Sequence, residues 1–256
     1  MKQSPLPSCF SRDSVTSTAD RPPFPRVAKG IIFDIDGTLC NSWKLGFDAT
    51  AKILQENSIP PITEGLYHEC TKYATPERLA RHAGLNPGDP EFVTVGNDLA
   101  RQFDDLYVGL VTTETAGYFP GIDRLLRSIP SDVMLGALTN ACVDYAVAVL
   151  RTNSETDGTF HRFRSIRGAD NVPAPKPAPD GLYEVCKDLG LSPKDCIYVG
   201  DSPSDAVAAE AAGMSSIGVL WGSHKEDSLK KAPFSAFCSS VDGLESLLTR
   251  IKMTEE

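Results

Sequence analysis

Five short apolar runs, separated by amphipathic helical patterns, constrain the fold of this chain more than any other feature of the sequence. The runs lie at residues 30–35, 133–138, 163–166, 196–199 and 216–220. Such nearly continuous apolar runs are typical of strands that a parallel sheet buries on both faces. The helical patterns that separate the later runs lie at residues 141–150, 180–189 and 203–212. This alternation predicts an α/β fold in which right-handed crossovers build a doubly wound parallel sheet.

The segment 41–118 interrupts this alternation, because its pattern is helical throughout. Apolar side chains recur at helical spacing in two stripes, which are Phe47, Ala51 and Leu54, and then Leu99, Phe103, Leu106, Tyr107 and Leu110. Residues 75–77 and residues 89–91 have the composition of helix starts, and Gly84 closes the first of these helices. We therefore expect a helical bundle inserted after the first strand.

The composition is that of a soluble globular protein, and it argues against nucleic acids and membranes as partners. The chain has 256 residues and 41% hydrophobic content, enough for the core of one large domain or two modest ones. Its 25 basic and 34 acidic residues give a net charge of −9, which disfavours a polyanionic partner. No apolar run approaches the roughly 20 residues that cross a bilayer, and no secretory signal is recognisable. The seven scattered cysteines form no C-x-x-C pair, which favours a reducing, cytoplasmic compartment.

Residues 1–29 differ from the rest of the chain in composition. They are rich in serine, threonine and proline and show neither helical nor strand periodicity. We expect a disordered N-terminal extension. An organelle-targeting peptide is the alternative, although Asp13 and Asp20 fit poorly in a class that is usually poor in acidic residues.

Two carboxylates, Asp34 and Asp36, end the first apolar run in the sequence FDIDGTLC. Residues two apart in an extended chain point the same way, so both should face one point beyond the carboxyl edge of the sheet. Asp36-Gly37 also has the composition of a tight hairpin turn, but residues 38–43 make an unconvincing return strand. Converging carboxylates require a cation, and Mg²⁺ is the expected one. One carboxylate could then attack an electrophile while its neighbour moves the proton of the leaving group.

A second acidic pair, Asp201 and Asp205, follows the fourth apolar run in the sequence VGDSPSDA. The turn from strand to helix should expose Asp201 at the same sheet edge as Asp34, where a third carboxylate facing the metal is its simplest use. Asp205 is either a further acid of the same site or an acid in the first turn of a helix, where the helix dipole stabilises its charge.

Two further signals are compatible with anion binding. Thr139 and Asn140 end the run 133–138, where they either cap the next helix or, with its free N–H groups, bind an anion. Lys176 lies in PAPKPAPD, where the prolines favour a stiff, extended backbone. That segment either directs the lysine toward the acids or serves as a proline-rich ligand for another protein.

The order of these groups resembles that of the haloacid dehalogenase superfamily of phosphohydrolases. Its four motifs match DIDGT, the strand-end Thr139, Lys176 before proline, and GDSPSD. The resemblance covers roughly residues 29–250, and the insertion lies where one class of these enzymes carries a helical cap. It implies a Rossmann-like catalytic core at 30–40 and 119–256 and a helical cap domain at 41–118, which follow the extension at 1–29 expected from composition.

The resemblance also implies roles for individual residues. Asp34 would be the nucleophile that forms an aspartyl phosphate, and Asp36 the general acid and base. The groups expected to bind the transferring phosphoryl group are Thr139, Asn140 and Lys176. Mg²⁺ would be held by the Asp34 carboxylate, the main-chain carbonyl of Asp36, and Asp201, with Asp205 behind these ligands.

The presence of Asp36 points to phosphate esters, because dehalogenases and phosphonate-cleaving relatives lack this second acid. A small phosphorylated metabolite is the expected substrate, and the overall pattern most resembles the phosphoglycolate phosphatase-like branch. A sugar-phosphate mutase, or a non-catalytic binding protein on the same fold, remains an alternative. Arg78, Arg81 and His82 lie within one helical turn of the insertion. They form either a solvated face or a site where one of them binds a carboxylate or second phosphate of the substrate.

Overall fold

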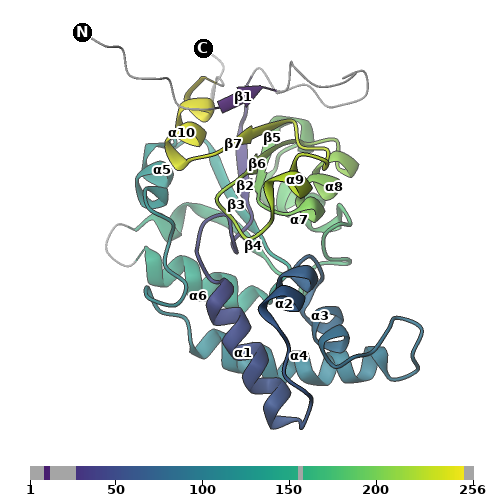
Figure 1. The fold of residues 1–256 in the computed structure, drawn as a ribbon. Helices are drawn as coiled ribbons and strands as arrows, with labels where there is room; N and C mark the ends of the chain where they lie inside the picture. The colour runs from purple at the N-terminus through teal and green to yellow at the C-terminus, as the bar shows by residue number, and fades with distance from the viewer. Residues whose placement is uncertain (1–8, 12–26, 155–157, 251–256) are drawn as a thin grey trace.

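A single mostly parallel sheet organises the chain, as the computed structural model shows for residues 9–11, 27–154 and 158–250. Among these described residues, seven strands form one sheet in the order β1-β7-β6-β5-β2-β3-β4 (Figure 1). The strands are β1 Cys9–Ser11, β2 Gly30–Phe33, β3 Met134–Leu138, β4 Phe163–Arg167, β5 Cys196–Gly200, β6 Ser215–Val219 and β7 Ala236–Cys238. Strands β2 to β7 run parallel, and β1 is antiparallel to β7. The predicted α/β class and parallel sheet are therefore confirmed.

Helices cover both faces of this sheet. They are α5 Ile122–Ser128, α6 Val143–Asn153, α7 Asp180–Leu189, α8 Pro203–Ala211 and α10 Val241–Arg250, with short elements at α9 Glu226–Leu229, η1 Thr159–Arg162 and η2 Pro193–Asp195. Successive residues of a strand face opposite sides. Ile32 accordingly packs with α7 and α8, whereas Ile31 and Phe33 pack with α5, α6 and α10. All four residues of β2 are buried, which explains its continuous apolar sequence.

Two strands, β1 and β7, were not predicted from the sequence. Cys9–Ser11 pair with β7, and in residues 27–29 Ala28 is fully buried while the Lys29 N–H donates to the Asp195 carbonyl at 2.8 Å, so the expectation of disorder throughout residues 1–29 is wrong for these two segments. An edge strand such as β7 offers unpaired main-chain groups, which an extended segment can join whatever its side-chain pattern. The rest of that prediction, for residues 1–8 and 12–26, lies outside the described residues, as does the targeting alternative for them.

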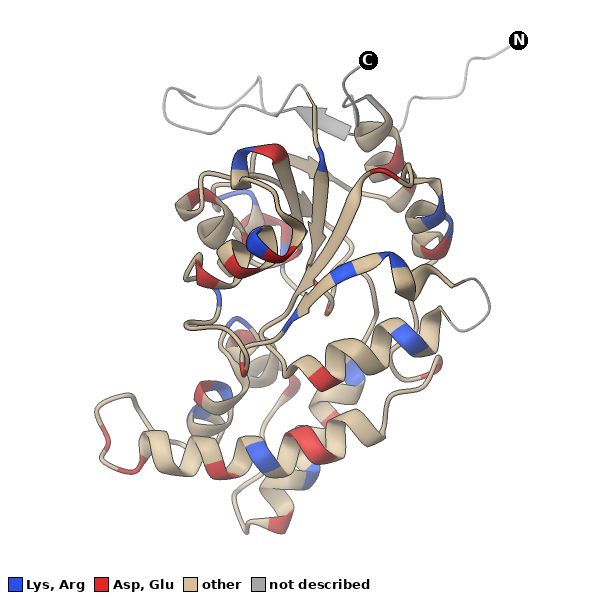
Figure 2. Ribbon diagram, turned by 180° about the vertical axis from the view of Figure 1, so that it is seen from behind, with Lys and Arg blue, Asp and Glu red and all other residues tan. Residues whose placement is uncertain are grey.

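Four helices form the insertion after β2: α1 Trp43–Glu56, α2 Glu64–Cys70, α3 Thr75–His82 and α4 Phe92–Gly109. They lie together beyond the carboxyl ends of the parallel strands (Figure 1). Acidic residues lie on all four helices and basic residues on α1, α3 and α4, as Figure 2 shows from behind. The division into a catalytic core at 30–40 and 119–256 and a cap domain at 41–118 stays a prediction.

The predicted helix faces hold for α4 better than for α1. On α4 the side chains of Leu99, Phe103 and Tyr107 are buried, as the stripe predicts. On α1 the buried face includes Leu45 and Ile53, whereas Phe47 and Ala51 of the predicted stripe are only half-buried. A period of 3.6 residues defines a face approximately, and contacts with α4 decide which edge of that face is covered.

Within the described part of the chain, no helix combines the length and the apolar character needed to cross a bilayer.

Candidate active site

The carboxyl ends of three neighbouring strands bring the predicted polar side chains to one edge of the sheet. Asp34 follows β2 directly, Thr139 follows β3 and Asp201 follows β5. These strands end in register, since the last residue of β2 pairs with Ala137 of β3 and Val199 of β5. The main-chain N–H of Asp34 continues this pairing and donates to the carbonyl of Val199 at 2.9 Å. The convergence expected from the sequence is therefore present.

Asp36 lies in a loop rather than a hairpin. The chain turns at Gly37 (φ 76°), whose N–H donates to the carbonyl of Cys40 at 3.0 Å, and it then enters α1. Glycine suits this position for two reasons. A positive φ disfavours residues that carry a side chain, and a Cβ at this position would lie 2.2 Å from Asp201 Oδ2. The hairpin alternative for Asp36-Gly37 is wrong, and the loop carries Asp36 into the same pocket as Asp34.

Lys176 is the cation at the centre of the site. Its Nζ donates to Asp34 Oδ1 at 2.8 Å, to Asp205 Oδ1 at 2.7 Å and to the hydroxyl of Tyr198 at 2.9 Å. Only 4% of Lys176 is exposed, so the alternative of a docking peptide for another protein does not apply to this residue. Burial lowers the pKa of Lys176, but Asp205 and Asp34 outweigh burial, so its pKa lies above the usual value. The ammonium therefore stays charged at neutral pH.

Asn140 secures the backbone of Lys176. Its Nδ2 donates to the carbonyl of Lys176 at 2.9 Å, and its Oδ1 accepts the N–H of Lys176 at 3.0 Å. Both ends of the Asn140 amide are therefore engaged, although the residue lines the pocket. The N-cap residue of α6 is Cys142, so the helix-cap alternative for Thr139 and Asn140 is wrong. A direct contact of Asn140 with a phosphoryl group stays a prediction.

Tyr198 contacts two of the predicted site residues, and sequence reasoning did not single it out. Its side chain is fully buried, and its hydroxyl donates to Asp205 Oδ1 at 3.0 Å and lies 2.9 Å from the Lys176 ammonium. Asp205 in turn accepts the N–H of Ser202 through Oδ2 at 2.9 Å and completes a capping box at the start of α8. The helix-start interpretation of Asp205 is therefore confirmed, since Oδ2 serves the start of α8, while Oδ1 contacts Lys176.

Asp201 occupies a close-fitting backbone cradle. Its Oδ2 accepts the main-chain N–H of Ser223 at 2.7 Å. A Cβ on either Gly37 or Gly222 would lie 2.2 Å from that oxygen, so both glycines are needed for the backbone to approach the carboxylate. Two loops, one after β2 and one after β6, therefore hold the Asp201 carboxylate in place.

The loop after β6 also brings a histidine that the sequence did not single out. His224 Nδ1 lies 3.7 Å from Asp201 Oδ2, and His224 lines the pocket. Burial lowers the pKa of His224, but its contact with Asp201 outweighs burial, so the pKa lies above its usual value. The position of this loop, directly after another parallel strand, was the available signal.

The acidic groups outnumber the cation that neutralises them. Asp34, Asp201 and Asp205 each offer a carboxylate oxygen, and these three oxygens lie within 4.8 Å of one another. Burial, and then the charge of Asp205, raise the pKa of Asp34 well above its usual range, against the opposing effect of Lys176. Three clustered carboxylates around one ammonium retain negative charge, and oxygen ligands suit a hard divalent cation. The donor set therefore fits a bound metal ion.

The carboxylate of Asp36 is surrounded by hydroxyl groups. Its Oδ1 accepts hydroxyls from Tyr145 at 2.6 Å, from Tyr107 at 3.4 Å and from Ser42. Its Oδ2 accepts the hydroxyl of Thr139 at 3.3 Å. Sequence reasoning singled out Thr139 and Asp36 but neither tyrosine, because an aromatic residue on the buried stripe of a helix looks like an ordinary core residue.

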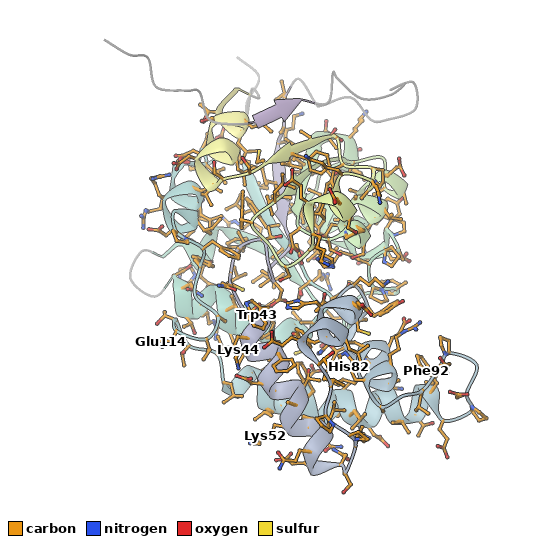
Figure 3. The ribbon with its side chains drawn as sticks, in the orientation of Figure 1. Trp43, Lys44, Lys52, His82, Phe92 and Glu114 are labelled. Carbon is orange, nitrogen blue, oxygen red and sulfur yellow. The ribbon has the colours of Figure 1, made fainter. Side chains whose placement is uncertain are left out.

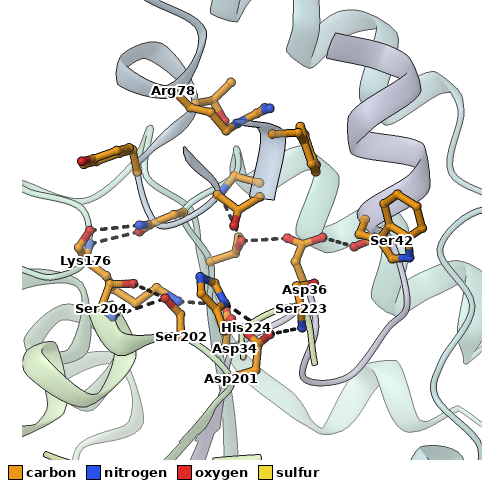
Figure 4. A pocket seen from close by; sticks show the side chains of 18 of the residues that line it. Asp34, Asp36, Ser42, Arg78, Lys176, Asp201, Ser202, Ser204, Ser223 and His224 are labelled. Carbon is orange, nitrogen blue, oxygen red and sulfur yellow. Dashed lines mark hydrogen bonds and ion pairs between the residues drawn. The ribbon is translucent and has the colours of Figure 1, made fainter. Parts of the chain in front are cut away.

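A pocket opens between this edge of the sheet and the insertion (Figure 4). Its floor includes Asp34, Asp36 and Lys176. Its lining on the side of the insertion includes Trp43, Tyr67, Thr71, Tyr73, Thr75, Arg78 and Phe103. Trp43 opens α1 at the junction with the sheet, as Figure 3 shows. A ligand held at Asp34 would therefore extend toward α2 and α3.

The three α3 residues singled out from the sequence, Arg78, Arg81 and His82, lie in different environments. Arg78 and His82 are 6% and 4% exposed, so the solvated-face interpretation is wrong for both. Arg81 donates to Glu77 Oε1 at 2.7 Å on the partly exposed side of the helix. Burial, and then the charge of Arg78, lower the pKa of His82 to about 4, so its ring is neutral at neutral pH. Of the three, Arg78 reaches the pocket.

Comparison with known proteins agrees with this geometry. The family described as haloacid dehalogenase-like hydrolase matches residues 31–219, which is most of the chain. The protein belongs to this family. The family predicted from the sequence is therefore confirmed, and with it the prediction of an enzyme.

Several named proteins are similar to most of this chain. The phosphoglycolate phosphatase of Shigella dysenteriae serotype 1 (strain Sd197) is 28% identical over 84% of this chain and 90% of its own length. That of Salmonella typhi is 30% identical over 76% of this chain and 82% of its own length. The crystal structure of CbbY from Rhodobacter sphaeroides in complex with phosphate has a TM-score of 0.71 and 24% identity, covering 88% of this chain and 99% of that one, which shows a shared fold. The predicted class, phosphoric monoester hydrolase, is that of the two phosphatases.

Proposed function

We propose that this protein is a Mg²⁺-dependent phosphatase that hydrolyses a monoester of a small metabolite through an aspartyl phosphate on Asp34. One observation carries the proposal. A buried carboxylate, Asp34, lies at the floor of an open pocket with a lysine ammonium 2.8 Å away and two further carboxylates beside it. Phosphoryl transfer needs this combination of a placed nucleophile with charge neutralisation of the phosphoryl oxygens.

The reaction has two steps on this chain. An Asp34 oxygen attacks phosphorus, the bond from phosphorus to the ester oxygen breaks, and the protonated Asp36 carboxyl gives its proton to the departing alcohol. Asp36 then takes a proton from water as the water oxygen attacks phosphorus. The bond from phosphorus to Asp34 breaks, and inorganic phosphate leaves. Lys176 neutralises charge on the phosphoryl group, and the Thr139 hydroxyl, already beside Asp36, contacts it in both steps.

The metal would be held by the Asp34 carboxylate, the main-chain carbonyl of Asp36, and Asp201. When bound, Mg²⁺ would neutralise negative charge on the phosphoryl oxygens and on the acidic cluster. Asp205 stays behind these ligands, because its Oδ1 accepts from Lys176 and Tyr198 and its Oδ2 accepts from Ser202.

Removal of the metal tests the proposal on the wild-type chain. With p-nitrophenyl phosphate and a panel of small phosphorylated metabolites, we expect turnover in MgCl₂. In EDTA we expect the turnover rate to fall by about 100-fold, the effect of removing one major electrostatic contributor, and to recover when Mg²⁺ is restored. Release of inorganic phosphate is the measurement.

Other outcomes would separate the alternatives. Conversion of a sugar phosphate to its isomer without net release of phosphate would show a mutase. Absence of turnover on every ester, with Mg²⁺ present, would contradict an enzyme and favour a binding protein on this fold.

The insertion side of the pocket supports a substrate with a second anionic group. The Arg78 guanidinium is buried, and it lies 4.7 Å from the centre of the Phe103 ring and 5.5 Å from that of Tyr67. Its Nη1 donates to the neutral hydroxyl of Thr50 at 2.8 Å. A buried guanidinium among aromatic rings and a hydroxyl is favourably placed to receive an anion from the pocket. Phosphoglycolate, with its carboxylate, and sugar phosphates that carry a second phosphate have this character.

Substitution of Arg78 tests this substrate class. We expect Arg78→Met to raise KM for a carboxylated or bisphosphorylated substrate by about 10- to 100-fold, the range for a charge-assisted contact. KM for p-nitrophenyl phosphate should change little, because this ester has no second anion. Arg81→Met is the matched control, since Arg81 pairs with Glu77 on the other side of α3. Equal increases for both kinds of substrate would contradict the assignment.

A further inference from the structure

The side chain of Asp36 is held asymmetrically by its neighbours. Three hydroxyls converge on Oδ1, those of Ser42, Tyr107 and Tyr145, whereas Oδ2 has a single contact, to Thr139 at 3.3 Å. These groups come from separate parts of the chain. Ser42 precedes α1, Tyr107 lies on α4 in the insertion, and Tyr145 lies on α6 beside the sheet.

We propose that Tyr145, assisted by Ser42 and Tyr107, is a positioning residue that anchors Oδ1 of Asp36 and leaves Oδ2 as the oxygen that exchanges protons with the substrate. This proposal rests on the proposed function, in which Asp36 is the general acid and base. It adds the residues that fix the geometry of proton transfer and names the atom that performs it.

The two tyrosines form a rigid support. Their rings are stacked with centroids 4.0 Å apart and an interplanar angle of 17°, and Phe103 packs on Tyr107 with centroids 4.7 Å apart. Tyr145 is fully buried, and 5% of Tyr107 is exposed. Burial, and then the charge of Asp36, raise the pKa of each phenol well above its usual value. Both hydroxyls therefore keep their protons and remain able to donate to Oδ1.

The identity of the proton-carrying oxygen follows from hydrogen-bond chemistry. A protonated carboxyl group has one O–H donor and one carbonyl oxygen that still accepts. Three hydroxyl donors around Oδ1 favour Oδ1 as the accepting oxygen, so the proton belongs on Oδ2. Oδ2 lies beside Thr139, which lines the pocket. The Thr139 hydroxyl oxygen accepts the N–H of Ala141 at 3.0 Å. This is the side on which the phosphoryl group is expected.

The anchored carboxyl then serves both chemical steps. The Oδ2–H bond breaks as the departing alkoxide, freed from phosphorus, takes the proton. In the second step Oδ2 accepts a proton from water while the water oxygen bonds to phosphorus and Asp34 leaves. Loss of the Tyr145 hydroxyl would free the Asp36 side chain to rotate, and a misplaced proton donor costs rate without weakening substrate binding.

The test compares esters that do and do not need a proton at the leaving oxygen. An alkyl phosphate releases a strongly basic alkoxide, whereas p-nitrophenyl phosphate releases a stabilised phenolate. We expect Tyr145→Phe to lower kcat/KM for the alkyl ester by about 10- to 100-fold, part of the range for general acid catalysis, with little change for the aryl ester. Tyr107→Phe should act in the same direction but less, because its hydroxyl is 3.4 Å from Oδ1.

A second comparison shows whether Tyr145 acts through Asp36. If it does, Tyr145→Phe should have no further effect on kcat/KM in the Asp36→Asn background, so the two substitutions would be strongly non-additive. Tyr183→Phe is the matched control, since its exposed phenol donates to the carbonyl of Ala211, on α8 and away from the pocket lining. Thermal unfolding of each variant shows whether it is folded. If Tyr145→Phe does not fold, Ser42→Ala replaces it with the same expectation.

Two results would overturn the inference while leaving the proposed function intact. One is an equal loss for alkyl and aryl esters, and the other is a full additional loss in the Asp36→Asn background. Failure of the wild-type chain to hydrolyse any phosphate ester with Mg²⁺ would instead contradict the proposed function itself. The metal-removal assay on the wild-type chain therefore distinguishes the two failures.

Discussion

Replacing Asp34 with asparagine is expected to lower kcat for p-nitrophenyl phosphate by roughly 10⁴-fold or more while the chain stays folded. The amide has nearly the shape of the carboxylate but is a poor nucleophile toward phosphorus. Its oxygen can still accept from the ammonium of Lys176, which lies 2.8 Å from Asp34 Oδ1 in the wild-type chain. The substitution therefore removes the attacking group and leaves its surroundings in place.

The same substitution should not destabilise the chain in EDTA. Burial, and then Asp205, raise the pKa of Asp34 well above its usual range, so its charged form is unfavourable in the fold. Above the unfolded-state pKa of about 4, folded Asp34 therefore binds more protons than the unfolded chain, and the free energy of unfolding falls as pH rises. Asparagine has no charge to bury, so Asp34→Asn lacks this pH-dependent decrease in the free energy of unfolding. We expect a Tm at neutral pH equal to or above that of the wild-type chain, measured by calorimetry.

Asp48→Asn is the matched control for this experiment, because Asp48 is an exposed acid on α1 that pairs with Lys44. Its kcat should equal that of the wild-type chain. Turnover of Asp34→Asn within about tenfold of wild type would assign the nucleophile to another residue.

The site could be predicted from the sequence where strand ends fix the position of a side chain. Asp34 and Asp201 directly follow apolar runs, and parallel strands in register must bring such residues to one edge. Lys176 follows no strand, so its place was implied by the family resemblance. The sequence around it indicated a stiff segment but not that Asn140 would secure that segment through two hydrogen bonds.

Residues whose role depends on tertiary packing could not be predicted. Tyr198 sits within a buried strand, where an aromatic residue looks like part of the core, and the function of its hydroxyl depends on the distant Lys176. Helical periodicity placed Arg78 and Arg81 near one another on α3. Only the contacts of α3 with its neighbours direct Arg78 to the pocket and leave Arg81 partly exposed. Local pattern therefore predicts elements and strand ends, but not which polar group an inserted helix buries.

Replacing Lys176 with methionine is expected to impair both stability and catalysis. Lys176 is the ammonium between Asp34 and Asp205, and all three side chains are at most 8% exposed. Removing one partner of a buried charge pair leaves the other charges uncompensated, which costs about 3–5 kcal/mol in the free energy of unfolding. Loss of one preorganised charge that neutralises the phosphoryl group should lower kcat by about 10²- to 10³-fold. Denaturant unfolding in EDTA and a phosphate-release assay with Mg²⁺ measure the two effects.

The stability loss should depend on pH in a direction that identifies its cause. The unfolded-state pKa of lysine is about 10.4, and the folded pKa of Lys176 is higher, so in the wild-type chain its contribution is fully present from pH 5 to pH 8. In the variant, Asp34 loses the neighbour that lowers its pKa, so that pKa rises further. The folded variant then binds extra protons above pH 4, and its free energy of unfolding should fall as pH increases. The deficit relative to wild type should therefore be smaller at pH 5 than at pH 8.

Lys187→Met provides the comparison for loss of a lysine from the surface. Lys187 is 74% exposed and pairs with Glu184 at 3.3 Å, so its loss should change the free energy of unfolding by no more than about 0.5 kcal/mol at either pH. A Lys176→Met deficit that stays constant between pH 5 and pH 8 would point to lost packing of the side-chain stem. A deficit that grows with pH would instead show that clustered carboxylates, brought together for a cation and a phosphoryl group, depend on this ammonium to coexist in the folded chain.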